Sequence, residues 1–358
     1  MVPEKKSYDI SYCTVSMNRA EHVKKTLTEN IENNLSSNVE FLLLDYNSED
    51  DLEIWTMNNM KHHIKSGKLK FFKTNEPTHF DRSHSRNMII KQAKGKYVCN
   101  VDADNYLGKG FSEYVIKIFS ENNNCYLGTD LDGVHYNLMD TYGRVCCEKS
   151  VFMTLRGYDE SLKGYGPEDK DFFSRLENIG ISKVTIKNTK FLRAIAHSNT
   201  ERICNEFLSK QLKDIYICHI NPERSIVLIT LFNKTYNLFE IEPNKYKSVI
   251  VANLVENSFQ EGKILIDKDE SIILQSEKNQ QVLSRSSSLE YRLNGTTIIF
   301  KKNTDVKFKQ KALIDIPLIM NQAKMQKNIL KNRNIVNELG FGEGSLVKNF
   351  GEKFNVYQ

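Results

Sequence analysis

The sequence predicts an α/β protein in which a mostly parallel sheet, flanked by helices, is followed by a smaller antiparallel β-rich domain and a helical C-terminal tail. About the first two hundred residues alternate short β-rich runs with helix-like stretches, which is typical of a parallel sheet covered by helices. Short strand candidates then follow one another, and the end of the chain becomes helical in composition. Because 358 residues suffice for two or three domains, we expect domains at 1–205, 206–303 and 304–358.

Periodicity predicts the elements of the N-terminal domain. Residues 20–34 place Val23, Leu27 and Ile31 on one face of a helix. Residues 39–45 are almost continuously apolar, as expected of a strand that is covered on both faces. By the same reasoning, we expect strands at 8–16, 39–45, 69–73 and 97–101, and helices at 20–34, 50–65 and 82–94.

The region after residue 204 predicts a meander of antiparallel strands. Asn294-Gly295 is a strong signal for a hairpin turn between two of them. Residues 277–288 are polar enough to be a mobile loop, and residues 312–339 are expected to be helical. The expected strands are 225–232, 236–241, 247–254, 262–266, 271–274, 289–293 and 296–300.

Composition excludes several classes of protein. No apolar run approaches the roughly 18 residues that a membrane helix needs, and residues 1–9 are polar, so we expect a cytoplasmic protein. The net charge of +5 is too mild to indicate nucleic-acid binding. Seven cysteines without a Cys-x-x-Cys pair indicate reduced core thiols rather than a disulfide framework or a zinc site.

Two carboxylates, Asp102 and Asp104, follow the expected strand at 97–101. In open α/β sheets, ligands bind beyond the carboxyl ends of the strands, so both acids lie where a site is expected. Carboxylates there can hold Mg²⁺ or Mn²⁺ together with substrate phosphates. The alternative to a metal site is that Asp102 and Asp104 belong to an ordinary turn exposed to solvent.

A second motif runs from Gly164 through Glu168 and Asp169 to Leu176. Its glycines and Pro167 predict a tight loop, and the two acids begin a helix. Acids in a first helical turn are stabilised by the helix dipole, which is the alternative explanation for them. The glycine-and-aromatic loop before the acids favours a platform for a sugar ring.

Five segments fall in the order seen in family 2 glycosyltransferases of the GT-A fold, which the chain resembles over residues 7–200. The part from residue 157 to 176 is similar to the C-terminal segment of β-1,4-galactosyltransferases and polypeptide N-acetylgalactosaminyltransferases. The segments are Cys13-Thr14-Val15-Ser16-Met17-Asn18-Arg19, Leu44-Asp45-Tyr46-Asn47-Ser48, Ser85-Arg86-Asn87, Asp102-Ala103-Asp104 and Gly164-Tyr165-Gly166-Pro167-Glu168-Asp169.

The resemblance implies a role for each matching residue. The nucleotide sugar would be bound by Arg19, Asp45 and Asn47 at the base and ribose, Arg86 at the diphosphate, and Asp102, Ala103 and Asp104 as the DxD motif. Asp169 would be the catalytic base, with Glu168, Tyr165 and Gly166 binding the acceptor or sugar. The metal, Mn²⁺ or Mg²⁺, would be held by Asp104, His197 and Asp102.

Three positions depart from the family pattern. Tyr46 stands where many members have a second acid, Ala194 where the metal-binding galactosyltransferases have methionine, and Pro167 where glycine is common. These departures concern base recognition, the metal site and the acceptor loop, respectively.

The resemblance implies a metal-dependent inverting glycosyltransferase that acts in glycan or polysaccharide biosynthesis. Its donor would be a nucleotide sugar, with UDP-galactose and UDP-N-acetylgalactosamine leading, and its acceptor a glycan, a lipid-linked sugar or a protein. Two alternatives stay open: a non-catalytic carbohydrate- or nucleotide-binding scaffold, and a nucleotidyltransferase or phosphohydrolase using the same Asp-x-Asp. The basic C-terminal half would serve acceptor recognition, dimerisation or peripheral contact with the inner face of the membrane.

Overall fold

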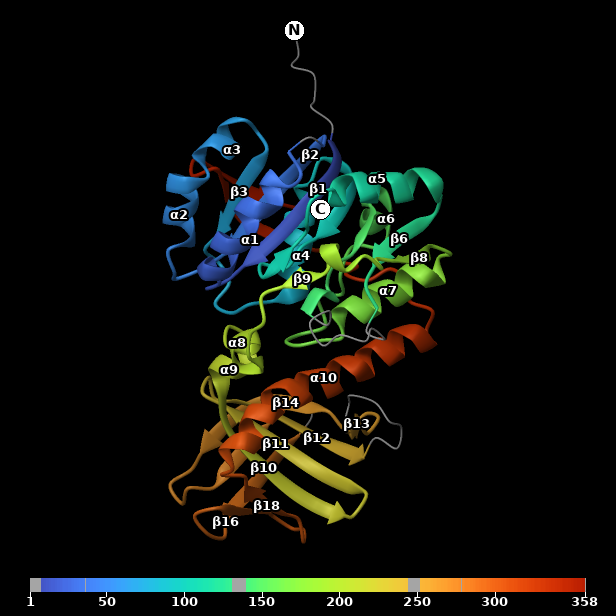
Figure 1. Ribbon diagram of the computed structural model, residues 1–358. Helices are drawn as coiled ribbons and strands as arrows, with labels where there is room; N and C mark the ends of the chain where they lie inside the picture. Colours follow the sequence, from blue (N-terminus) through green and yellow to red (C-terminus); the bar gives the residue numbers. More distant parts are fainter. Residues whose placement is uncertain (1–7, 36, 131–139, 244–251, 278, 358) are drawn as a thin grey trace. The chain divides into compact units, whose positions relative to one another are not determined.

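The structure is a computed structural model that describes residues 8–35, 37–130, 140–243, 252–277 and 279–357. The chain forms two compact units (Figure 1). Unit 1 comprises Met1–Asn205 together with Asn328–Gln358, and unit 2 comprises Glu206–Lys327. The segment 304–358, which we expected to be a helical domain of its own, is instead divided between the two units. Its composition predicts a helix but carries no signal that the chain returns to the first unit.

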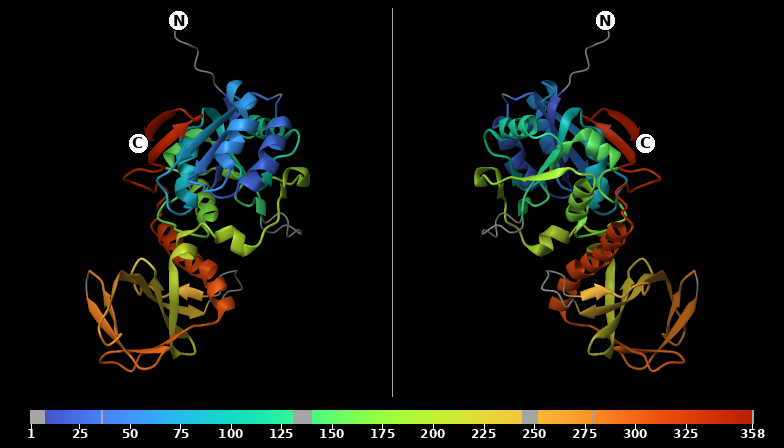
Figure 2. Two further views of the ribbon diagram at one scale, coloured as in Figure 1. Left: turned by 90° about the vertical axis from the view of Figure 1, so that its left-hand side faces the viewer. Right: turned by 90° about the vertical axis from the view of Figure 1, so that its right-hand side faces the viewer.

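A nine-stranded sheet forms the centre of unit 1, in the order β20-β19-β3-β2-β1-β4-β7-β6-β8. Its central strands are parallel: β1 (Tyr8–Ser16), β2 (Val39–Tyr46), β3 (Leu69–Thr74) and β4 (Gly95–Asn100). One edge is formed by β7 (Cys146–Glu148), β6 (Cys125–Gly128) and β8 (Ser182–Thr185). The C-terminal hairpin of β19 (Gly344–Lys348) and β20 (Glu352–Val356) joins β3 at the other edge, where it appears red in Figure 2.

Helices cover both faces of this sheet, because its central strands are apolar on both sides. Phe41 and Leu43 pack in one core, with residues of α1 (Ala20–Glu32) and α5 (Phe111–Glu121). Leu42 and Leu44 pack in the other core, with residues of α4 (Arg82–Lys91), α6 (Lys149–Thr154) and α7 (Glu168–Asn178). The helix expected at 50–65 is interrupted at Met60, between α2 (Leu52–Asn59) and α3 (Lys61–Lys65).

Short elements complete the carboxyl edge of the central strands. β5 (Asn105–Tyr106) pairs with β9 (Arg193–Ala194) in a small antiparallel sheet. The 3-10 helix η2 (Thr189–Phe191) precedes β9, and α8 (Asn199–Ile203) follows it. This arrangement brings the segment after residue 193 to the loop that follows β4.

Unit 2 is an antiparallel barrel followed by a long helix. The sheet closes because β11 pairs with both β10 and β12. Leu228, Leu274, Leu283 and Phe300 belong to its apolar core. The elements are α9 (Phe207–Gln211), β10 (Leu212–Asn221), β11 (Arg224–Leu231), β12 (Thr235–Pro243), β13 (Ala252–Leu254), β14 (Gln260–Ile266), β15 (Ile272–Gln275), β16 (Gln280–Arg285), β17 (Glu290–Leu293), β18 (Ile299–Lys302) and α10 (Val306–Leu330).

The predicted fold class is confirmed, with two corrections in the barrel. The expected mobile loop at 277–288 is wrong, because Gln280–Arg285 forms β16 between β15 and β17, with Leu283 fully buried. The ten-residue strand β10 was not expected, and part of the strand expected at 247–254 lies outside the described residues. The cysteines are all free, and no helix among the described residues is long and apolar enough to cross a membrane.

Candidate active site

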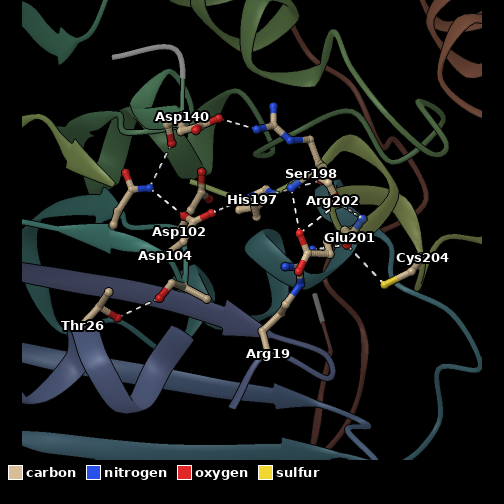
Figure 3. A network of polar contacts seen from close by, with 12 residues as sticks. Arg19, Thr26, Asp102, Asp104, Asp140, His197, Ser198, Glu201, Arg202 and Cys204 are labelled. Atoms are coloured by element: carbon tan, nitrogen blue, oxygen red, sulfur yellow. Dashed lines mark hydrogen bonds and ion pairs between the residues drawn. The ribbon is translucent and has the colours of Figure 1, made fainter. Parts of the chain in front are cut away.

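The two carboxylates after β4 point in different directions. Asp102 Oδ1 accepts hydrogen bonds from Asn100 Nδ2 at 3.1 Å and from Arg86 Nη2 at 3.0 Å. The backbone turns immediately after it, where Asn105 N donates to Asp102 O, and β5 begins. Asp104 lies beyond this turn and faces the segment after β9 (Figure 3).

Arg86 joins the two sequence motifs that carry acids. It lies on α4 with 4% of its surface exposed, and its Nη1 donates to Asp169 Oδ1 at 2.9 Å and lies 3.3 Å from Glu168 Oε1. With the bond to Asp102, one guanidinium therefore holds three carboxylates. Burial opposes the charge of Arg86, but these carboxylates more than offset it and raise its pKa.

The environment separates the pKa values of Asp169 and Asp102. Burial raises the pKa of Asp169 to about 7, with Arg86 opposing this rise and Glu168 adding to it. Burial also disfavours the charge of Asp102, but the adjacent Arg86 outweighs it and lowers the pKa of Asp102. The Asp169 carboxyl is thus suited to exchange a proton near neutral pH, while the Asp102 carboxyl stays ionised.

Asp104 meets His197 rather than Asp102. Asp104 Oδ2 and His197 Nε2 lie 2.6 Å apart, and the contact with Asp104 raises the pKa of His197. The pairing of β5 with β9 brings them together, because Asn105 lies opposite Ala194 and Ile195 N donates to Asp104 O. The structure thus brings together two residues that the resemblance assigns to one metal site, although 93 positions separate them.

The described residues contain no group of three or more histidine, cysteine or acidic side chains that could hold a metal ion. Asp102 is directed at Arg86, so the three expected ligands do not form one cluster. Asp104 and His197 nevertheless fit a cation that takes its remaining ligands from water and substrate phosphates. Their imidazole nitrogen favours Mn²⁺ over Mg²⁺, which prefers oxygen ligands.

Arg202 of α8 contacts both Asp140 and the loop before Asp169. It forms an ion pair with Asp140 and its Nη1 lies 3.3 Å from Tyr165 Oη. The Arg82 guanidinium stacks on the Tyr165 ring, with 5.3 Å between the guanidinium carbon and the ring centroid. Asp140 in turn contacts β5, since its carbonyl accepts from Asn105 Nδ2 at 2.9 Å.

The residues expected to bind the base and ribose lie apart from the Arg86 cluster. Asp45, at the end of β2, is buried and accepts from Ser48 N at 2.8 Å, and burial raises its pKa. Asn47 donates to the carbonyl of Pro77 at 2.7 Å. Arg19 donates to the carbonyl of Glu201, which links α1 to α8.

Ala103 and Gly166 contribute backbone rather than side-chain chemistry. The carbonyl of Ala103 accepts from Thr26 Oγ1 at 2.7 Å, which anchors the turn between the two aspartates. Gly166 has a φ of 48°, a left-handed conformation that favours glycine in the loop before Asp169.

The sequence motifs did not identify Gly143, Asn105 or Arg202. A Cβ on Gly143 would lie 2.7 Å from Asp102 Oδ2 and 2.9 Å from Arg86 Nη2. Gly143 therefore packs directly against Asp102 and Arg86, and only glycine leaves room for them. Its carbonyl accepts from Asn100 Nδ2 at 2.9 Å. Gly143 and Arg202 carry no local signal because their partners are distant in sequence, whereas Asn105 directly follows the Asp-x-Asp motif and donates to Asp104.

Two family models match the chain. The model described as glycosyl transferase family 2 matches residues 11–155, and the model described as the N-terminal domain of galactosyltransferase matches residues 133–199. No curated protein matches the chain.

Several solved structures are similar to part of the fold. TarS 1–349 of S. aureus is 15% identical with a TM-score of 0.41, and the match covers 50% of this chain and 58% of that one. The mannosyltransferase PcManGT of Pyrobaculum calidifontis, in complex with GDP-Man and Mn²⁺, is 14% identical with a TM-score of 0.42, at 51% and 55% coverage. A Drosophila β-1,4-galactosyltransferase 7 mutant with manganese, UDP-Gal and xylobiose is 13% identical with a TM-score of 0.38, at 55% and 73% coverage.

The matched part of this chain thus spans less than two thirds of the TarS and PcManGT chains. The two family models overlap over residues 133–155 and together cover the carboxylate cluster, Arg86, Asp104 and His197. Residues 11–155 of this chain are therefore a family 2 glycosyltransferase domain, which residues 133–199 extend with a galactosyltransferase segment.

Proposed function

We propose that this chain is a metal-dependent, inverting glycosyltransferase that moves a hexose or N-acetylhexosamine from a nucleotide sugar to an acceptor hydroxyl. UDP-galactose and UDP-N-acetylgalactosamine are the leading donors, because residues 133–199 match the galactosyltransferase model. The acceptor is a glycan, a lipid-linked sugar or a protein. The observation that carries the proposal is the bridge made by Arg86 between Asp102 after β4 and Asp169 at the start of α7.

Asp169 is the general base in this proposal. Its pKa of about 7 allows it to take a proton from the attacking hydroxyl near neutral pH, where a carboxyl of ordinary pKa is a weak base. Arg86 holds one of its oxygens, which fixes the direction from which the proton is accepted. A single base and a single displacement invert the configuration at the anomeric carbon.

Asp104 and His197 are the residues that would hold Mn²⁺ or Mg²⁺ in the donor site. When bound, the cation would neutralise the charge that develops on the departing nucleoside diphosphate. Asp104 is fixed for this task by the hydrogen bond from Asn105 Nδ2 to its Oδ1 at 2.7 Å, which leaves Oδ2 directed at His197.

We assign the diphosphate contact to Arg202 rather than to Arg86. Arg86 is buried, and three carboxylates already compensate its charge. Arg202 has 22% of its side chain exposed, one carboxylate partner, and an Nε that finds no hydrogen-bond partner among the described residues. Guanidinium groups of this kind bind phosphate oxygens through paired N–H donors.

The test compares Asp169→Asn with Glu177→Gln, which makes the same carboxylate-to-amide change on the same helix but outside the site. Wild type, Asp169→Asn and Glu177→Gln are titrated with UDP in the presence of Mn²⁺, and UDP release from UDP-galactose and UDP-N-acetylgalactosamine is followed with a panel of glycoside acceptors. We expect Asp169→Asn to bind UDP like wild type and to lose transfer by a factor of about 10² to 10⁴. Glu177→Gln should retain transfer.

Three outcomes would contradict the proposal. Full turnover by Asp169→Asn would remove its assignment as base. Binding of UDP and Mn²⁺ by wild type without transfer to any acceptor would favour the binding scaffold. Release of pyrophosphate in place of UDP would identify a nucleotidyltransferase.

A further inference from the structure

Arg144 is a buried cation that the proposed chemistry does not use. It lies in the loop before β7 and has no exposed surface. Within the described part of the chain it forms no ion pair, and its Nε has no hydrogen-bond partner. Burial lowers its pKa. A buried charge without a counter-charge destabilises the folded state, so its presence calls for a physical reason.

Among the described residues, the side-chain hydrogen bonds of Arg144 all reach the two segments that carry Asp104 and His197. Its Nη1 donates to the carbonyl of Phe191, two residues before β9. Its Nη2 donates to Asn105 Oδ1 at 2.9 Å and to the carbonyl of Tyr106 at 3.1 Å, both in β5. The rigid guanidinium therefore ties β5 to the chain that enters β9.

The bond to Asn105 also determines which way the Asn105 amide faces. Arginine has only donors, so it selects the oxygen of the amide and turns Nδ2 away from itself. Asn105 Nδ2 then donates to Asp104 Oδ1 at 2.7 Å and to the carbonyl of Asp140 at 2.9 Å. The reversed amide would place N–H against N–H at Arg144 and oxygen against carboxylate at Asp104.

We propose that Arg144 is a positioning residue that orients the Asp104 carboxylate toward His197 through the Asn105 amide. Arg144 itself touches neither side chain of the pair. This inference rests on the proposed function, because it assigns Arg144 to the metal-binding pair of that site. Residues that orient metal ligands in this way typically alter metal affinity about 10- to 100-fold when replaced.

The test measures Mn²⁺ binding directly, from the electron paramagnetic resonance signal of free Mn²⁺, with and without UDP. Arg144→Lys keeps the charge but cannot span Asn105, Tyr106 and Phe191. Asn105→Ala leaves Arg144 in place and removes the amide that links it to Asp104, together with the contact of that amide with the Asp140 carbonyl. We expect both variants to raise the Kd for Mn²⁺ about 10- to 100-fold.

Arg175→Lys is the matched control. Arg175 is also a buried arginine of unit 1, but its donors reach Asp171 and the carbonyls of Leu155 and Gly157. Its replacement should lower Tm and leave the Kd for Mn²⁺ unchanged, as a purely structural role would. Circular dichroism verifies that each variant is folded, and Asn105→Ala still tests the relay if Arg144→Lys does not fold.

Two results are distinguished by this design. If wild type binds Mn²⁺ and both folded variants bind it with wild-type Kd, the role of Arg144 is overturned and the proposed function stands. If wild type takes up no Mn²⁺ even with UDP, the metal-dependent function fails, and the inference fails with it.

Discussion

The pH dependence of Asp169 offers a direct test of its role as base. Burial, opposed by Arg86 and reinforced by Glu168, raises its pKa to about 7 from an ordinary value of 3.8. A carboxyl with this pKa is about one tenth ionised at pH 6 and about nine tenths ionised at pH 8. We therefore expect kcat/KM for transfer to rise about tenfold between pH 6 and pH 8.

The same group should make the stability of unit 1 depend on pH. Between pH 4 and pH 7 the folded state holds the Asp169 proton and the unfolded state does not. The free energy of unfolding therefore falls as the pH rises through this range, and the dependence ends above about pH 7. A pKa difference of about 3 between the folded and unfolded states corresponds to a contribution of about 4 kcal/mol to the free energy of unfolding. Asp169→Asn has no proton to release and should lack this contribution.

Urea unfolding at pH 5, 6, 7 and 8, without divalent cations, measures the effect for wild type, Asp169→Asn and Glu177→Gln. The wild-type and Glu177→Gln curves should fall relative to that of Asp169→Asn as the pH approaches 7. Parallel curves for all three proteins, together with a flat kcat/KM between pH 6 and 8, would refute the reasoning.

Two glycines offer further tests. Gly143→Ala would place a methyl group 2.7 Å from Asp102 Oδ2 and 2.9 Å from Arg86 Nη2. We therefore expect kcat/KM to fall about 10²-fold with little change in Tm. Unchanged kcat/KM would show that catalysis tolerates displacement of Asp102 and Arg86. Gly342→Ala would place its methyl 2.6 Å from the Asn87 carbonyl carbon, at a left-handed φ of 56°, and should lower the free energy of unfolding by about 1–3 kcal/mol in urea titrations. An unchanged urea midpoint would show that the C-terminal segment does not rest on α4.

Most of the N-terminal sheet could be predicted because its signals are local. β1 has the predicted bounds, and β2, β3 and β4 differ from them by one or two residues. β16 was missed because only Leu283 on it is fully buried, so a barrel strand with two partners resembles a polar loop in sequence. β19 and β20 were missed because their hairpin joins the sheet through the pairing of β19 with β3, which lies far away in the chain.

Some contacts of the candidate site were likewise expected from the sequence, and others were not. The pairing of Asp104 with His197 was expected from the resemblance, and the structure brings them together. The partners of Arg86 were not expected, since a guanidinium assigned to a diphosphate is engaged by three carboxylates. No sequence motif marks Arg144, because its side chain joins β5 to the segment before β9, and these segments meet only in the folded chain.

The sequence by itself determined which segments form the parallel strands, where the acids follow them, and which glycines allow the loop before Asp169. These features depend on burial, periodicity and backbone freedom, which act between neighbouring residues. Only the tertiary structure decided that Arg86 gathers Asp102 with Asp169, that β9 carries His197 to Asp104, and that residues 328–358 return to the first unit. Those outcomes depend on contacts between residues that lie tens to hundreds of positions apart, and such contacts leave no periodic trace in the sequence.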